Sequence, residues 1–508
     1  MAKQSDTRRR RSLEAEFDDG FSATAHGGGA LAARVMRRLG MAKLVGLLPE
    51  RAAEAKYKTA VCSLAMMASL LLGRRGIGAA ELLREDALLA EVFDLRNRVP
   101  EEATMHRALC DIAGLEYREF SETYESAPVC ETRLDMFGND KTSVEHRRIV
   151  PEEPEFVGNE TLTQLHAFES AVASRCAKSM KRSRFRLRDV YVLFGDATDL
   201  EVRGDCFDAA RRDHNGNRSI RAFTVSSGPL TFAHELAEGA TYEAATLPRV
   251  LERGWSCARR VFGKLKRYLS LLDTSFFEKR VLDWHAENNV HFIIGANKER
   301  EHLTKLAVAG AHTWCAGATD RDRFEESQVT AFSYKAESWD RPVTIIARRY
   351  RKKSEMPGTL KHYYFIATNL EEGDLPHRFI KKYGYCEAIW RMYGTKQGHE
   401  NNYKTPLSDL GLHHPPSGRI GIDQVYYTLG FAAANIAAVM SHAIFGNEVF
   451  AKCRDRAIRL WRMREKYFRI PGYLVRQGGA LIVRLAGGDM GEERKRLWDE
   501  AWRLAARI

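Results

Sequence analysis

The chain has 508 residues, a formal net charge of +12 and a hydrophobic content of 44%. This length predicts two to four domains, and the apolar fraction is sufficient to build their cores. Clustered Lys and Arg side chains bind polyanions because they release counterions from phosphates, so the charge favours a nucleic-acid partner.

Several classes of protein are excluded by the cysteines and the N-terminus. The nine cysteines form no CxxC pair and have no regular spacing, which argues against a zinc ribbon and a disulfide framework. The N-terminus carries Arg8 to Arg11 without the apolar stretch of a signal peptide. We therefore expect a reduced, intracellular setting.

Two apolar runs resemble membrane spans, from Ala60 to Leu72 and from Thr428 to Phe445. The first is shorter than the about 20 residues that a bilayer requires. The second contains Asn435, Ser441 and His442. Both runs are interpreted as buried helices, and no membrane partner is expected.

The N-terminal part divides into a tail and a helical region. Residues 1–27 are basic, then acidic, then Gly-rich, which is typical of disorder. Helical periodicity follows in three stretches, Leu31–Leu39, Lys58–Leu72 and Ala79–Phe93. Pro100–Leu109 begins another helix, which is either a plain structural helix or part of a helix-turn-helix-like module that touches DNA.

Residues 116–188 show little periodicity and end in a basic run from Lys178 to Arg188. A run of this kind directly before a buried strand is either a phosphate-binding edge or a solubilising segment. Both interpretations stay open from the sequence.

A strand-rich block follows the basic run. Turn residues separate apolar runs that predict strands, with amphipathic stretches that predict helices between them. The strands are Val190–Gly195, Arg221–Val225, Thr231–Leu236, Tyr268–Asp273 and Val290–Gly295, and the helices are Ala244–Arg253, Cys257–Leu265 and Phe276–Glu287. The order is therefore three strands, a helical segment, a strand, a helix and a strand. This is the order of a ribonuclease H-like core.

The predicted fold class is therefore α/β: an RNase H-like mixed sheet with flanking helices, interrupted by a β-rich insertion and preceded by a helical domain. Val343–Ala347 and Tyr363–Thr368 are expected strands of the insertion, and a helix from about Pro376 to Lys404 returns to the core. The predicted boundaries are a disordered basic tail at 1–27, a helical DNA-binding domain at 28–150, the first part of the core at 151–300, the β-rich insertion at 301–375, the C-terminal core helices at 376–445 and a basic helical region at 446–508.

Three carboxylates occupy positions typical of a metal site. Asp196 and Asp273 each end an apolar strand, and Glu400 lies in the returning helix. Carboxylates gathered on one sheet bind pairs of divalent ions, which is the usual apparatus for cutting and joining phosphodiesters.

Each of these assignments has an alternative in the sequence. Asp199 or Asp205 competes with Asp196, and Glu387 competes with Glu400. Asp273 is also suited to cap the helix that follows it.

The order and spacing of four motifs resemble the DDE transposases of bacterial insertion sequences, in the branch with a β-rich insertion before the Glu. The similarity extends roughly from Gly28 to Phe445. The motifs are Asp196-Ala-Thr-Asp199, Asp273-Thr-Ser-Phe276-Phe277, Ala367-Thr368-Asn369-Leu370 and Tyr393-x2-Lys396-x3-Glu400-Asn401.

The chain departs from the family motif Tyr-x2-Arg-x3-Glu-x6-Lys at two places. Lys396 replaces the Arg, and Leu407 stands where the final Lys is expected. A lysine keeps the charge but loses the bidentate fork of a guanidinium. Lys404, one turn beyond Glu400, is expected to supply the missing charge. Tyr393 is expected to contact a phosphate, unless it is simply a tyrosine at the edge of the core.

The resemblance implies that the chain is a transposase that binds the inverted terminal repeats of an insertion sequence, cleaves the DNA and transfers the strand by a two-metal mechanism. Two Mg²⁺ ions, with Mn²⁺ as a substitute, are expected on Asp196, Asp273 and Glu400. The expected partners are double-stranded DNA and a second copy of the chain in the synaptic complex. The expected location is the bacterial cytoplasm, in association with the nucleoid.

Further DNA contacts are expected from the basic end of an insertion strand, and other segments are weaker candidates. Arg454–Arg469 interleaves aromatic and basic residues, which suits DNA or a solvated helix equally, and Trp339 is a candidate for stacking on a base. The alternative functions are an RNase H-like nuclease or resolvase without strand transfer, and an inactive DNA-binding relic. The basic residues of the strand end are Arg348, Arg349, Arg351 and Lys352.

Overall fold

A computed structural model describes most of the chain. The described residues are 23–95, 98–118, 124–134, 140–148, 153–187, 190–202, 207–212, 216–239, 246–318, 324–356, 358, 360–375, 377–450, 457–477, 480–488 and 491–508. Within these ranges the side chains of 124–134, 140–148, 324–325, 398–405 and 480 are not described. Residues 1–22 of the predicted disordered tail lie outside the described residues, whereas Thr24 forms a β-bridge with Gly472.

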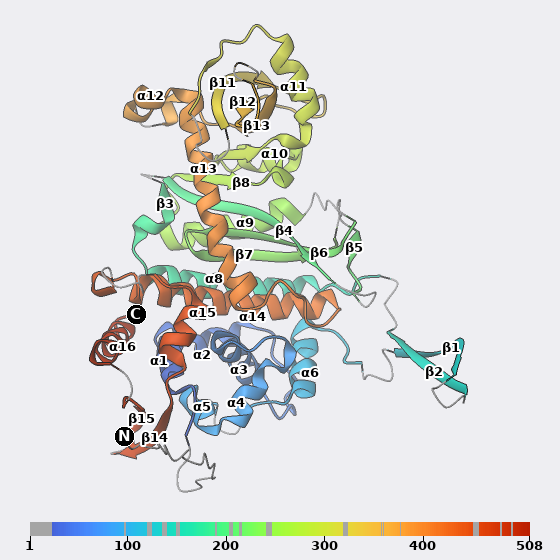
Figure 1. The fold of residues 1–508 in the computed structure, drawn as a ribbon, viewed down its shortest axis with the longest axis vertical. Coiled ribbons are helices and arrows are strands. Elements are labelled where there is room, and N and C mark those ends of the chain that lie inside the picture. The colour runs from blue at the N-terminus through green and yellow to red at the C-terminus, as the bar shows by residue number, and fades with distance from the viewer. Residues whose placement is uncertain are drawn as a thin grey trace, which may run out of the picture.

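One mixed sheet organises the centre of the molecule (Figure 1). Its middle strands run in the order β7-β6-β4-β8-β9, in which β4 is antiparallel to β6 and parallel to β8. This arrangement confirms the predicted RNase H-like fold. The strands are β4 (Val190–Glu201), β6 (Arg218–Ser227), β7 (Leu230–Ala237), β8 (Tyr268–Leu272) and β9 (His291–Gly295), with β3 (Arg186–Leu187) beside β4 and β5 (Arg211–Arg212) beside β6.

The insertion continues this sheet instead of forming a separate one. Strand β13 pairs with β9 through Ile366↔Gly295, so the insertion strands extend the core sheet on its β9 side. They are β10 (Cys315–Ala316), β11 (Phe324–Tyr334), β12 (Val343–Lys352) and β13 (His362–Thr368).

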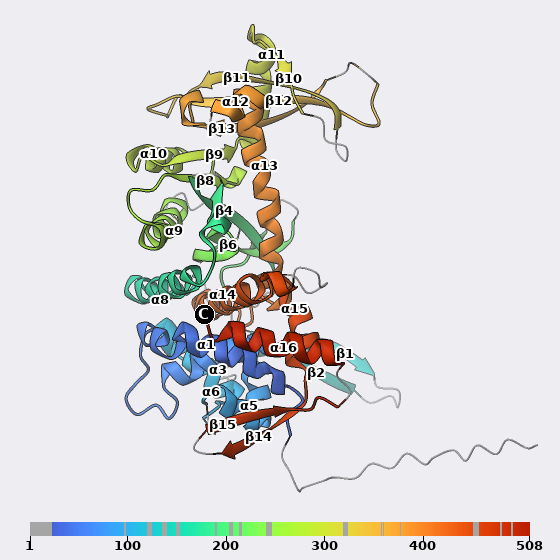
Figure 2. The same cartoon turned by 90° about the vertical axis from the view of Figure 1, so that its left-hand side faces the viewer.

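Helices cover both faces of the sheet (Figure 2). On one face lie α8 (Asn159–Lys178), α9 (Thr246–Phe262) and α10 (Lys279–Glu287). The other face carries α13 (Tyr385–Lys404), which runs from the insertion to the level of α14 (Ile420–Val439) (Figure 1). Helices α11 (Arg300–Ala309) and α12 (His377–Tyr383) lie at the insertion.

Three helix predictions differ from the structure. The helix expected from Pro376 to Lys404 is broken at Gly384, whose φ of +74° is a left-handed conformation that ends α12. The two helices expected between 244 and 265 are one helix, α9. Helix α8 was not predicted at all, although its buried residues Leu165, Phe168, Val172 and Cys176 recur at helical spacing.

The N-terminal helices and the C-terminal segment form one lobe below the sheet (Figure 1). Arg464 joins them, because its guanidinium is buried and donates to the carbonyls of Leu70 (2.6 Å), Leu71 (2.8 Å) and Asp409 (2.7 Å). The lobe contains α1 (Ala30–Leu39), α2 (Met41–Leu44), α3 (Thr59–Leu72), α4 (Glu81–Glu85), α5 (Ala87–Val92), α6 (Glu102–Ala113), α15 (Leu460–Met463), α16 (Glu492–Ala505) and the hairpin of β14 (Gly472–Gln477) and β15 (Ala480–Leu485).

Helix α14 (Ile420–Val439) lies between this lobe and the sheet, in contact with α3, α8 and β7. Within the described residues, the segment Ile420–Ile444 is long and apolar enough to cross a membrane, and 78% of its apolar window is buried inside the protein. A helix that is apolar on all sides is also what the centre of a large protein requires.

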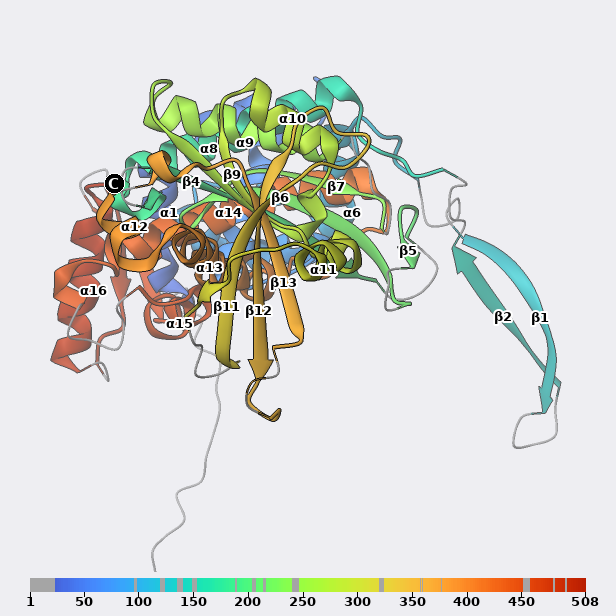
Figure 3. The ribbon, with the colours of Figure 1, turned by 90° about the horizontal axis from the view of Figure 1, so that it is seen from above.

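Strands β1 (Tyr124–Leu134) and β2 (Asp140–Arg148) form an antiparallel hairpin that projects from the body (Figure 3). The hairpin falls in the region expected to be helical.

Candidate active site

Asp196 and Asp273 lie at the same edge of the sheet. Strands β4 and β8 are parallel, with Gly195 opposite Leu272, and the two aspartates are the next residues of each strand. The Asp273 backbone N–H donates to the Gly195 carbonyl at 3.2 Å. Neighbouring strands are about 4.8 Å apart, so both carboxylates start from adjacent backbone positions.

Gly195 allows the Leu272 side chain to pack closely against the backbone of β4. A Cβ atom at this position would lie 2.4 Å from Leu272 Cδ2, a distance that no packed side chain tolerates. Gly195 therefore has a packing role beside Asp196.

Helix α13 contributes a cation to this edge. Lys396 Nζ lies 3.1 Å from Asp196 Oδ1, and the side chains of the two residues are 9% and 22% exposed. The sequence predicted Lys396 as a DNA contact and Asp196 as a metal ligand. The structure brings the two together in one ion pair.

Tyr393 is also at this edge, one helical turn before Lys396. Its hydroxyl donates to the Leu272 carbonyl at 3.3 Å. Burial raises the pKa of the Tyr393 phenol, and the charges of Tyr364 and Asp273 raise it further. Tyr393 is therefore a protonated donor beside Asp273 at neutral pH.

Sequence reasoning missed Tyr364, whose side chain is hydrogen-bonded to that of Tyr393. This tyrosine is on β13, and its hydroxyl interacts with the side chains of Tyr393 and Asn297. Burial raises the pKa of its phenol, and the charge of Asp273 acts in the same direction. Nothing in the sequence distinguishes Tyr364 from its neighbour Tyr363, because the distinction depends on which face of β13 meets α13.

Glu400 and Lys404 lie in the last turns of α13, and their side chains are outside the described part of the structure. Glu400 is four residues after Lys396, which places it one turn further along the same helical face.

The alternative ligands have different surroundings. Asp199 is three residues beyond Asp196, so it faces the opposite side of β4, where Arg221 holds it at 2.7 and 3.0 Å. Glu387 is 6% exposed and pairs with Arg348 at 2.5 Å. Both carboxylates already have guanidinium partners, and Asp205 lies outside the described residues.

Three of these basic residues, Arg348, Arg349 and Arg351, have partners elsewhere in the protein. The Arg348 guanidinium lies over Trp390 at 4.6 Å, and that of Arg349 lies over Trp314 at 4.2 Å. Arg351 is 5% exposed and donates to the Glu355 carbonyl at 2.7 Å, whereas Lys352 is exposed. DNA contact by these four residues stays a prediction.

The two weaker candidates are also partly accounted for by packing. Trp339 makes edge contacts with Phe277 and Tyr334, at ring distances of 5.2 and 5.4 Å. In the segment 454–469, the first residues lie outside the described part, Trp461 is 49% exposed, and Arg464 is buried.

The residues at this edge fit a divalent cation. Asp196 and Asp273 offer hard oxygen donors, and the Lys396 ammonium already places a positive charge against Asp196. Among the side chains that the structure describes, no group of three or more His, Cys, Asp or Glu is close enough to hold a metal. The third candidate ligand, Glu400, is not in that set.

Comparison with known proteins gives one family match. The family model described as Transposase DDE domain group 1 matches residues 196–494, which is more than half of the chain and begins at Asp196. No curated protein is significantly similar. A cryo-EM structure of a piggyBac transposase synaptic complex with hairpin DNA is similar to 61% of this chain, with 12% identity and a TM-score of 0.35. The aligned part spans 58% of that chain, less than two thirds of its length.

Proposed function

The chain belongs to the Transposase DDE domain group 1 family, and we propose on that premise that it cuts and joins DNA at the ends of its own mobile element. The proposed substrate is a pair of inverted terminal repeats in a bacterial insertion sequence, the proposed reaction is cut-and-paste transposition, and the proposed setting is the bacterial cytoplasm. Two ends must be brought together, so two copies of the chain are proposed to act in one complex.

The observation that carries this proposal is the position of Asp196 and Asp273 side by side on adjacent parallel strands, Asp196 within β4 and Asp273 directly after β8, with Lys396 of α13 against Asp196. Two carboxylates at one sheet edge, with a third expected one turn beyond Lys396, supply the oxygen ligands that Mg²⁺ or Mn²⁺ requires. Two such ions would activate the attacking hydroxyl and stabilise the leaving oxygen.

The protein's own side chains orient the reacting phosphate. Lys396 is available to move from Asp196 to a phosphate oxygen when DNA and metal arrive, because its flexible stem allows several positions. Tyr393 keeps its proton, so it acts as a hydrogen-bond donor beside Asp273 and not as a base.

The test uses purified protein and labelled duplex DNA that carries the sequences flanking the gene. Wild type is compared with Asp196→Asn, Asp273→Asn and Glu400→Gln in Mg²⁺ and in EDTA. We expect cleavage at the element ends and joined products in Mg²⁺, both lost in EDTA and in each variant, with DNA binding retained.

The other outcomes identify the alternatives. Metal-dependent cutting without end preference or joining would favour an RNase H-like nuclease or resolvase. Binding without cutting by the wild type would favour an inactive DNA-binding relic. Cleavage that survives Asp196→Asn would contradict the proposed site.

A further inference from the structure

A group of cationic side chains lies at the start of β4 and β8, away from Asp196 and Asp273. The turn between α9 and β8 contains Lys264, Leu265, Lys266 and Arg267, all of them exposed. Arg267 precedes β8 and Asp273 follows it. Six residues of extended chain separate them by about 20 Å.

The basic run before β4 lies beside this turn. Strand β3 pairs with the start of β4 through Arg186↔Tyr191, and the Tyr191 N–H donates to the Arg267 carbonyl at 3.0 Å. Phe185 packs against Phe262 with ring centroids 5.1 Å apart. The two segments therefore form one surface, which we call the basic edge and define by the exposed residues Lys181, Arg182, Arg184, Arg186, Lys264, Lys266 and Arg267.

An open cleft of about 750 Å³ adjoins the basic edge, between the α9–β8 turn and the start of β9. Lys264, Lys266 and Arg267 line it, together with Arg259. Leu265 is 99% exposed in the same turn. An exposed leucine side chain between two lysines has no apolar contact among the described residues that stabilises the fold. It is suited to contact a deoxyribose or a base step.

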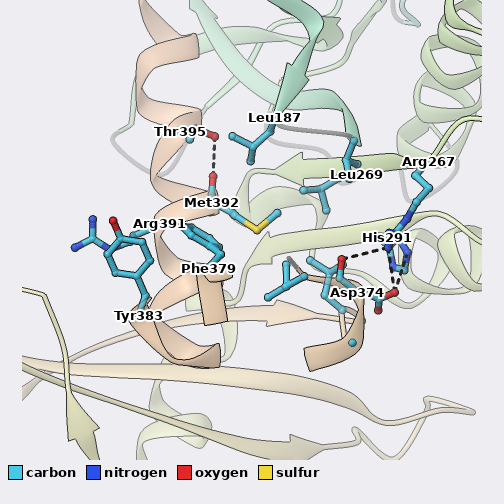
Figure 4. A pocket seen from close by; sticks show the side chains of 14 residues that line it. Leu187, Arg267, Leu269, His291, Asp374, Phe379, Tyr383, Arg391, Met392 and Thr395 are labelled. Atoms are coloured by element: carbon cyan, nitrogen blue, oxygen red, sulfur yellow. Dashed lines mark hydrogen bonds and ion pairs between the residues drawn. The ribbon is translucent and has the colours of Figure 1, made fainter. Parts of the chain in front are cut away.

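Part of this positive charge is neutralised locally. Arg267 pairs with Asp374 at 3.1 Å, and His291 lies 3.7 Å from the same carboxylate (Figure 4). These residues also line a more apolar pocket of about 460 Å³ behind the cleft. Lys264 and Lys266 are exposed in this turn, so they are accessible to a polyanion.

We propose that the basic edge binds the phosphate backbone of a second stretch of duplex DNA, separate from the stretch at Asp196 and Asp273. The inference rests on the proposed function, because it assumes that DNA is the polyanion this chain works on. Exposed lysines on a turn contact phosphates without reading bases, so the binding is expected to be independent of sequence. An enzyme that joins two DNA segments has to hold DNA beyond the reacting phosphodiester, and this surface is placed to do so.

The first experiment measures the affinity for a fluorescein-labelled 30-base-pair duplex of arbitrary sequence, by anisotropy, at a series of salt concentrations. The full chain is compared with Lys264→Ala/Lys266→Ala. Each lost phosphate contact lowers the slope of log K against log salt by about one, so we expect the slope to fall by about two. The control, Lys43→Ala/Lys305→Ala, removes the same charge from α2 and α11.

The second experiment detects the contact directly. Leu265→Cys in a Cys315→Ser background carries a photo-crosslinker, since Cys315 is an exposed cysteine of the described residues. Cross-linking to the duplex is expected. An unchanged salt slope together with absent cross-linking would overturn the proposal.

The two proposals fail in different ways. Lys264→Ala/Lys266→Ala is expected to keep metal-dependent cleavage of a short duplex that contains only the element end, because neither lysine is near Asp196. If the wild type cleaves DNA but the slope does not change, only the basic edge is wrong. If the wild type never cleaves DNA but the slope falls, the surface stands and the catalytic proposal fails.

Discussion

Lys396 Nζ lies 3.1 Å from Asp196 Oδ1, so a side chain from α13 neutralises the first carboxylate of the candidate metal site. An ammonium and a divalent ion compete for the same oxygen. The position of α13 therefore determines whether Lys396 neutralises the Asp196 carboxylate or leaves it free to bind a metal ion.

We expect Lys396→Met to raise the affinity of the DNA-free protein for Mn²⁺ about fivefold, because a partly buried ion pair of this kind contributes on the order of 1 kcal/mol. The measurement is an EPR titration of free Mn²⁺. Lys381→Met removes the same charge from an exposed site on α12 and serves as the control. A weaker or unchanged affinity in Lys396→Met would show that the ammonium does not compete with metal.

Glu400 and Glu387 are both in α13, and the two are expected to respond differently to the same substitution. Glu387→Gln leaves the guanidinium of Arg348, which is 11% exposed, without its carboxylate, so we expect a loss of about 3 kcal/mol in unfolding free energy. Glu400→Gln is expected to abolish metal-dependent cleavage with little change in stability. Urea unfolding and a cleavage assay are carried out on both variants. Loss of cleavage in Glu387→Gln at full stability would make Glu387, and not Glu400, the third metal ligand.

The core strands were predictable because each contains an apolar run, and the aspartates that follow two of these runs marked the candidate site. The end of the first strand was not predicted, since β4 continues past Asp196 to Glu201. The pairing of Lys396 with Asp196 was not predictable, since it joins residues 200 apart in the chain and depends on how α13 crosses the sheet. The same is true of Tyr364, whose contact with Tyr393 depends on which face of β13 meets α13. The structural partners of Arg348 were missed because a basic run looks the same whether it is solvated or buried.

Gly295, at the end of β9, provides a test of how tightly the surroundings of Tyr393 and Asp273 are packed. A Cβ atom there would lie 2.5 Å from Thr274 Oγ1 and 2.9 Å from the Tyr393 hydroxyl. We expect Gly295→Ala to cost about 1–3 kcal/mol of stability and to displace Tyr393, with a loss of cleavage greater than the loss of folded protein.

The control for Gly295→Ala is Gly394→Ala in α13, where nothing lies within 4 Å of the added Cβ. Alanine is favoured over glycine inside a helix, so this variant is expected to be more stable by about 0.5–1 kcal/mol. Thermal unfolding and cleavage are measured for both. Equal cleavage by Gly295→Ala and wild type would mean that the edge tolerates a shift of Tyr393.

Three histidines predict a loss of stability in mild acid: His285 is buried, and His166 and His442 are half-buried. Burial lowers the pKa of His285 and His442 to about 4 and that of His166 to about 2, whereas an unfolded histidine has a pKa of about 6.5. Between pH 6.5 and 4 the unfolded chain therefore binds protons that the folded protein does not, and the free energy of unfolding falls as the pH falls.

His285→Leu is expected to remove about 1 kcal/mol of the stability difference between pH 7.5 and pH 5.5, because one pKa unit corresponds to about 1.4 kcal/mol. Leucine suits this site, since the ring is fully buried between Trp284 and Phe292 and its Nε2 has no partner among the described residues. The measurement is urea unfolding of wild type and variant at both pH values. A pH dependence that is the same in the two proteins would mean that His285 is protonated in the folded state, and its neutral, buried form would then be wrong.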